Sequence, residues 1–174
     1  MDNSDEFQLL SKSKGYLEAA RVIVDTKGNK PVLRAPVAHL IAHGIEVLMK
    51  HHLLRQGVPY KGLTTKKYGH NLSVLWRHEK SVRFRQAAKA EAKNAWENAK
   101  NSHQFQDDFD KNPHSELVEQ IDHLSRLHTQ DTDFALRYLA EPDETAPIPL
   151  FLLDVFEPLQ NRLSLTYFGK SSEI

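Results

Sequence analysis

Apolar side chains recur every three or four residues along most of this chain of 174 residues, which is the spacing of one face of an α-helix. The sequence shows no pair of alternating apolar and polar runs joined by a hairpin turn. The pattern therefore predicts an all-α protein, a single-domain up-and-down bundle of about five to six helices over residues 1–174. The helices are expected at 7–25, 36–56, just after Gly69, 81–100, 113–127 and 150–168.

Glycine and proline mark the expected breaks between these helices. Gly28 ends the first helix and Pro31 extends the break, because glycine terminates helices and proline interrupts them. Residues 60–68 are expected to form a loop, and 134–139 a short apolar element. Pro158 is expected to break or kink the last helix, because it lacks an N–H group to donate.

The helix expected from Pro36 has the clearest pattern. Proline fits a first turn, where the missing N–H costs nothing. The face expected to be buried carries Val37, Leu40, Ile41, Gly44, Ile45 and Leu48. Because glycine weakens a helix by about 1 kcal/mol relative to alanine, Gly44 predicts the close approach of a neighbouring helix. The opposite stripe consists of His39, His43, Glu46 and Lys50.

This polar stripe has two interpretations. His39 and His43 stand at i and i+4, and Glu46 follows a turn later, so the three side chains could chelate a divalent metal ion. Alternatively, the stripe is a solvated or interface surface on which Glu46 and Lys50 form an ordinary i, i+4 ion pair. We favour the second interpretation, and we predict no metal and no other cofactor.

Three other histidines are candidates for chemistry. His51 and His52 are adjacent and therefore point about 100° apart on a helix, so they cannot form one site without other ligands. His70 lies in the segment Tyr-Gly-His-Asn-Leu, where a loop becomes a helix. We expect its imidazole to hydrogen-bond the free backbone groups of a helix end. Ligand contact or catalysis by His70 is the alternative.

Composition narrows the function further. The chain has no cysteine, which excludes a disulfide scaffold, a thiolate nucleophile and a cysteine-bound metal. It has no glycine-rich phosphate loop and no Gly-x-Ser-x-Gly motif. Hydrophobic residues make up 40% and charged residues 26%, as in soluble globular proteins. The first residues are acidic, and the longest apolar run, 150–153, is too short to cross a bilayer. We expect a cytoplasmic protein with no membrane partner.

Charge is unevenly distributed although the formal net charge is zero. Residues 50–100 hold twelve lysines or arginines and three acids, a balance of +9. Acidic side chains concentrate in residues 107–122. The two segments could pair within the chain, or the basic one could face phosphates or nucleic acid. We favour internal pairing, because no nucleic-acid-binding motif accompanies the charge.

Four segments carry a family resemblance: GYLEAARVIVD, PVAHLIAHGIEVLMKHHLLRQG, KKYGHNLSVLW and FALRYL. In this order they resemble the HEPN domain superfamily of prokaryotic helical-bundle proteins. Such domains carry an acidic residue and a lysine one turn apart in an early helix, which Glu46 and Lys50 match. They also carry a lysine followed by a Gly/Thr-His-(Asp/Asn)-Leu turn, matched by Lys67 and the segment 69–72. The segment 134–138 resembles the short Arg-Tyr segment that many members carry before the last helix.

The resemblance implies a helical bundle that forms homodimers and binds a protein partner or a nucleotide-like ligand. Such modules are often found beside nucleotidyltransferases or in toxin–antitoxin and phage-defence systems. The ligand-binding positions that it implies are Glu46, Lys50, Lys67, Tyr68, His70 and Arg137.

Catalytic members of the superfamily are metal-independent ribonucleases with an Arg and, four to six residues later, a His near the start of the last helix. Here Arg137 and Arg162 have no such partner, because no histidine follows His128. Arg34 and His39 have the right spacing but lie in the wrong helix. We therefore predict a non-catalytic member. The alternative is an RNA-acting enzyme with a non-standard site, in which His70 is the acid or base and Arg137 the electrostatic stabiliser.

Overall fold

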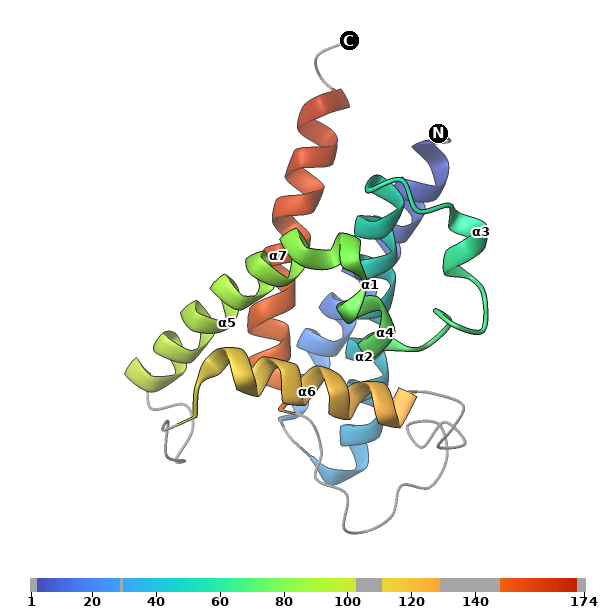
Figure 1. Cartoon of the computed structure of the whole chain (residues 1–174). Helices are drawn as coiled ribbons and strands as arrows, with labels where there is room; N and C mark the ends of the chain where they lie inside the picture. Colours follow the sequence, from blue (N-terminus) through green and yellow to red (C-terminus); the bar gives the residue numbers. More distant parts are fainter. Residues whose placement is uncertain (1–2, 29, 103–110, 129–147, 172–174) are drawn as a thin grey trace.

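The computed structural model describes residues 3–28, 30–102, 111–128 and 148–171 (Figure 1). Within these ranges the chain is all-helical, with no strand. The elements are α1 (Asn3–Lys27), α2 (Pro31–Arg55), α3 (Tyr60–Leu63), α4 (Leu72–Arg77), a 3₁₀ turn η1 (Glu79–Ser81), α5 (Val82–Asn101), α6 (Pro113–His128) and α7 (Pro149–Ser171). The all-α prediction is confirmed. The short apolar element expected at 134–139 lies outside the described residues.

The six predicted helices correspond to α1, α2, α4, α5, α6 and α7. The described residues add α3, a single turn within the segment predicted as a loop, so the expected count of five to six is not confirmed. In addition, α7 continues through Pro158 rather than breaking there.

The start of α2 corrects the prediction for Pro31 and Pro36. Pro31 does not extend the break; it begins the helix, at a position that needs no N–H donor. Pro36 consequently lies inside the helix instead of in its first turn. Its ring removes the hydrogen bond to the carbonyl of Val32. Because Val32 is 79% exposed, water can hydrogen-bond that carbonyl and the interruption is tolerated.

At Gly44, α1 packs closely on α2. A Cβ at this position would lie 2.8 Å from side-chain atoms of Leu17, and the hydroxyl of Ser13 donates to the Gly44 carbonyl at 2.9 Å. The close approach predicted from the sequence is therefore confirmed, with α1 as the neighbour. In Figure 1, α7 also runs beside α1, whereas α6 lies across the lower part of the bundle and departs from a simple up-and-down arrangement.

The helix α2 occupies the centre of the fold and is covered by α1, α4, α6 and α7. The stripe expected to be a solvated or interface surface lies largely inside the fold: Glu46 is 3% exposed and Lys50 8% exposed, while His39 and His43 are half-buried. By length and composition, α2 is the one helix in the described part of the chain that could also cross a membrane, a test that the core helix of a bundle passes equally well.

Candidate functional site

The carboxylate of Glu46 is the centre of a buried polar cluster. Its Oε1 accepts a hydrogen bond from Nζ of Lys50 at 2.6 Å. Its Oε2 lies 3.1 Å from Nδ1 of His70 and 2.9 Å from Nε2 of His128. Nδ1 of His43 lies 3.7 Å from the same oxygen. Three imidazoles and one ammonium group therefore surround one carboxylate.

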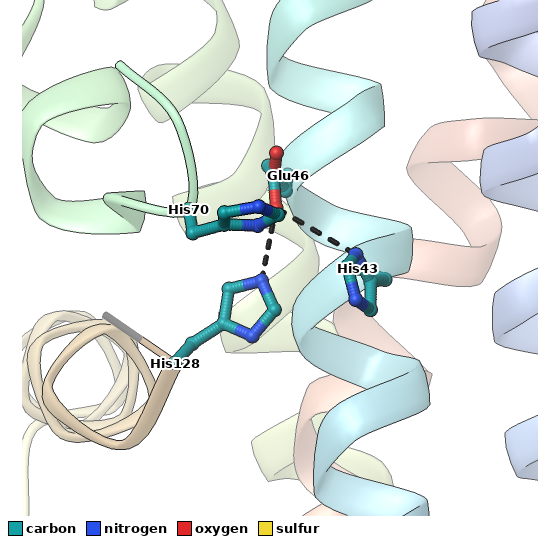
Figure 2. Close-up of side chains that lie close together, drawn as sticks. All are labelled: His43, Glu46, His70 and His128. Atoms are coloured by element: carbon teal, nitrogen blue, oxygen red, sulfur yellow. Dashed lines mark hydrogen bonds and ion pairs between the residues drawn. The ribbon is translucent and has the colours of Figure 1, made fainter. Parts of the chain in front are cut away.

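Three separate parts of the chain supply these side chains (Figure 2). His43, Glu46 and Lys50 follow one another at i, i+3 and i+7 on α2, so they share one helix face. His70 is in the loop that precedes α4, and His128 is the last residue of α6. Figure 2 shows the three imidazoles directed toward the carboxylate from these three elements.

Hydrogen bonds between α4 and α6 hold the outer two histidines in place. Asn71 caps α4, and its side chain accepts from the backbone N–H of Val74. The backbone N–H of Ser73 donates to the hydroxyl of Ser125, and the Ser73 hydroxyl donates to Asp122 at 2.6 Å. These bonds fix α4 against the last turns of α6. They place His70 and His128 on the same side of α2.

His70 has a backbone conformation that side chains rarely adopt. Its φ is +58°, in the left-handed region, where Asn, Asp and His are enriched among non-glycine residues. The contact that this conformation allows is with the Glu46 side chain, and the cap of α4 is Asn71 instead. His70 thus ties its loop to the middle of α2, a longer-range connection than the helix-end bond expected from the sequence.

The charges of the cluster follow from its burial and its hydrogen bonds. Burial alone would raise the pKa of Glu46, but hydrogen bonds from His128 and His70 and the Lys50 ammonium together hold that pKa well below its ordinary range. The ionised carboxylate can only accept, so Nδ1 of His70 and Nε2 of His128 carry the hydrogens. Burial, followed by the neighbouring His128, lowers the pKa of His43 to about 4. His43 is therefore neutral at neutral pH.

Further aromatic rings enclose the cluster. The ring of His39 stands edge-on to that of His43, with centroids 4.4 Å apart, and lies 5.7 Å from that of His128. Tyr16 of α1 stacks on His43 at 5.4 Å. His70 is the residue through which the cluster meets the solvent, because 37% of its side chain is exposed, against 4% for Glu46.

The geometry meets the requirements of a metal-binding group. His43, Glu46, His70 and His128 each offer one ligand atom, and these four atoms lie within 4.8 Å of one another. The metal-binding set considered from the sequence shares His43 and Glu46 with this group, but it includes His39 where the structure brings in His70 and His128. No sequence signal marked His128, which lies 82 residues from Glu46.

The structure brings together some of the ligand-binding residues implied by the family resemblance. Glu46, Lys50 and His70 meet in one cluster. Nζ of Lys67 lies 5.1 Å from the centre of the Tyr68 ring, and that ring packs at 5.8 Å from His78. Lys67 and Tyr68 thus form a pair of their own, in which Lys67 is exposed and Tyr68 packs partly against the core. Arg137 lies outside the described residues.

The basic segment 50–100 is largely at the surface. Its exposed side chains are Lys61, Lys66, Lys67, Arg77, Lys80, Arg83, Lys93 and Lys100. Arg77 pairs with Asp122 of the acidic segment at 2.6 Å. Asp107, Asp108 and Asp110 lie outside the described residues. Internal pairing of the two segments is therefore seen at one position in the described part of the chain.

Comparison with known proteins gives no relative for this arrangement. No family model, no curated protein and no solved structure matches the chain. A functional assignment therefore depends on the motifs in the sequence and on the geometry of the Glu46 cluster.

Proposed function

We propose that this chain is a non-catalytic binding and accessory module of the HEPN type, which acts as a cytoplasmic homodimer. One observation supports the proposal above others. The two motifs of the resemblance lie apart in the sequence, yet their residues contact each other: Glu46 of the first, which pairs with Lys50, also contacts His70 of the second. A shared cluster explains why both motifs occur in one chain.

As an accessory module, the chain would bind a protein partner. That partner would belong to a nucleotidyltransferase, toxin–antitoxin or phage-defence system. The absence of the ribonuclease Arg–His pair from the sequence supports a role without catalysis. Because 37% of the His70 side chain is exposed, a small ligand can contact this residue of the cluster.

The assembly can be tested directly by light scattering coupled to gel filtration. At micromolar concentration we expect a mass of twice 20.0 kDa. A mass of about 20 kDa over the whole micromolar range would contradict the proposed dimer.

A ribonuclease activity is the second candidate function, and one observation favours it. His70 is partly exposed and its Nδ1 is held by the Glu46 carboxylate, which is how a general base is oriented in many active sites. We nevertheless expect no cleavage of single-stranded RNA by the purified protein in the presence of EDTA. Gel analysis of a labelled RNA measures this.

The variants decide between the two candidates if cleavage is seen. Loss of cleavage in His70→Asn would establish the alternative enzyme. Loss in Arg34→Ala or His39→Ala would instead assign the activity to the Arg34–His39 spacing in α2. Cleavage that all three variants retain indicates a contaminating nuclease.

A further inference from the structure

We propose that His43, Glu46, His70 and His128 bind one zinc ion, which ties α2, the loop before α4 and the end of α6 together. This inference deepens the proposed function and rests on it, because it names the ligand of the site that the two motifs form. It also replaces the expectation of no metal. That expectation was based on His39, His43 and Glu46, whereas the structure places His70 and His128 beside Glu46.

The distances from the carboxylate to the three imidazoles are close to those of a tetrahedral site. Ligands at zinc distances of about 2.0–2.1 Å stand roughly 3.3 Å apart at the corners of a tetrahedron. From Oε2 of Glu46, the three imidazole nitrogens lie at 2.9, 3.1 and 3.7 Å. The remaining separations extend to at most 4.8 Å. Small rotations of the imidazoles therefore complete the coordination without moving a helix.

Hydrogen bonding alone does not account for so many imidazoles. One carboxylate oxygen offers two lone pairs, and His70 and His128 use both on Oε2. His43 is directed at the same oxygen from 3.7 Å, beyond hydrogen-bond distance. A third nitrogen converging on a saturated acceptor is explained by an ion between the four groups. When the ion binds, His70 and His128 turn lone pairs inward and carry their hydrogens on the other ring nitrogen.

The donor set selects the class of ion. Three nitrogens and one oxygen suit zinc and neighbouring divalent transition metals, whereas Mg²⁺ and Ca²⁺ prefer sites built of oxygen ligands. Lys50 holds Oε1 at 2.6 Å and leaves Oε2 for the ion, so Glu46 would be monodentate. The Lys50 contact also fixes the rotation of the carboxylate, as partners outside the ligand set commonly do.

The number of protein ligands indicates a structural ion rather than a hydrolytic one. Catalytic zinc keeps a position for water, whereas four protein ligands fill a tetrahedron. The ligands come from three elements that are distant in the sequence, so the ion would cross-link them. Its binding free energy would add to the stability of the native fold.

Metal titration of the chelator-stripped, full-length protein tests the inference. Addition of Co²⁺ should give the visible absorption of a tetrahedral site, saturating at one ion per chain, and Zn²⁺ should displace it. We expect His70→Asn and His128→Gln each to lower the zinc affinity by at least about tenfold, measured by competition with a chromophoric chelator. Asparagine tolerates the positive φ of His70, so that variant should fold even if His128→Gln does not.

The matched control is His114→Gln, because His114 is exposed near the start of α6, at the opposite end from His128. It should bind zinc as the wild type does. Wild-type protein that binds no zinc, or His70→Asn that binds it with unchanged affinity, would overturn the inference.

Light scattering on the same samples separates this inference from the proposed function. A dimer that binds no zinc overturns the metal site alone. A monomer that binds one zinc per chain overturns the proposed assembly and supports the metal site.

Discussion

Replacing Glu46 by leucine should cost about 3–5 kcal/mol of stability in the metal-free protein, because it leaves the Lys50 ammonium in the bundle interior with no counter-charge. His70 and His128 would lose their acceptor at the same time. Urea unfolding of chelator-treated protein, followed by circular dichroism, measures the loss. It is a large share of the total stability of a domain of this size.

The second half of the ion pair should respond differently. Lys50→Met should lower the free energy of unfolding by less than Glu46→Leu does, because Glu46 keeps the hydrogen bonds from His70 and His128. The double variant Glu46→Leu with Lys50→Met should recover the part of the loss that comes from the unpaired ammonium, since it removes both buried charges, although His70 and His128 still lack their acceptor. A double variant no more stable than Glu46→Leu alone would show that the ammonium is not the source of the loss.

The chain offers a matched control for this comparison. Lys14 and Glu18 form another i, i+4 pair at 3.5 Å, with both side chains more than half exposed. Exposed pairs of this kind are worth about 0.3–0.5 kcal/mol. Glu18→Leu should therefore leave the urea midpoint nearly unchanged. An equal loss at Glu18 and Glu46 would contradict the role of burial.

Local patterns in the sequence were sufficient to predict most helices. The bounds of α5, α6 and α7 agree with their predicted ranges to within a few residues, because each has an apolar periodicity that its packed face requires. Gly44 predicted a close helix neighbour correctly, since a Cβ at this position would lie only 2.8 Å from the side chain of Leu17. These features depend on spacing within one helix, which a single sequence contains.

Errors arose where the outcome depended on what packs around a helix. The stripe of His39, His43, Glu46 and Lys50 has the pattern of a solvated or interface face, but α4 and α6 pack on α2 and two of its residues, Glu46 and Lys50, are buried. Periodicity shows that two faces differ, whereas only the tertiary arrangement shows that the polar face is also buried. Similarly, Pro36 has the pattern of a helix start, but the helix begins one turn earlier, at Pro31, and includes Pro36 in its interior.

The candidate site could be predicted only in part for the same reason. Glu46, Lys50 and His70 belong to the motifs of the family resemblance, so the sequence singled them out without showing that they are in contact. His128 is an unremarkable residue at the end of an amphipathic helix. Its role follows from the crossing of α6 over α2 and from the bonds of Ser73 to Ser125 and Asp122. No spacing rule connects residues so far apart.

His51 provides the other large expected effect, which is a dependence of stability on pH. Its side chain is fully buried in α2, near Tyr167 of α7, and neither ring nitrogen has a hydrogen-bond partner among the described residues. Burial, together with the nearby charges of Arg55 and His52, lowers the pKa of His51 from 6.5 to about 4. The imidazole is therefore neutral in the native protein at neutral pH.

The direction of the effect follows from proton binding. Between these two pKa values the unfolded chain holds a proton at His51 that the native protein does not, so stability falls as the pH decreases. Above pH 6.5 the contribution of His51 to stability no longer changes with pH, and below about pH 4 that contribution is completely lost. It amounts to about 3 kcal/mol in total, and about 2 kcal/mol of it is lost between pH 7 and pH 5.

The variant His51→Leu isolates this contribution from those of the other titrating groups. Leucine suits the apolar surroundings and removes a buried N–H that lacks an acceptor among the described residues, so the variant should be at least as stable as the wild type at about pH 7. At about pH 5 the advantage of the variant over the wild type in free energy of unfolding, measured with urea, should be larger by about 2 kcal/mol. His114→Leu on the exposed face of α6 should follow the wild-type pH profile. Parallel profiles for His51→Leu and the wild type would mean that His51 gains its proton in the native protein as readily as in the unfolded chain.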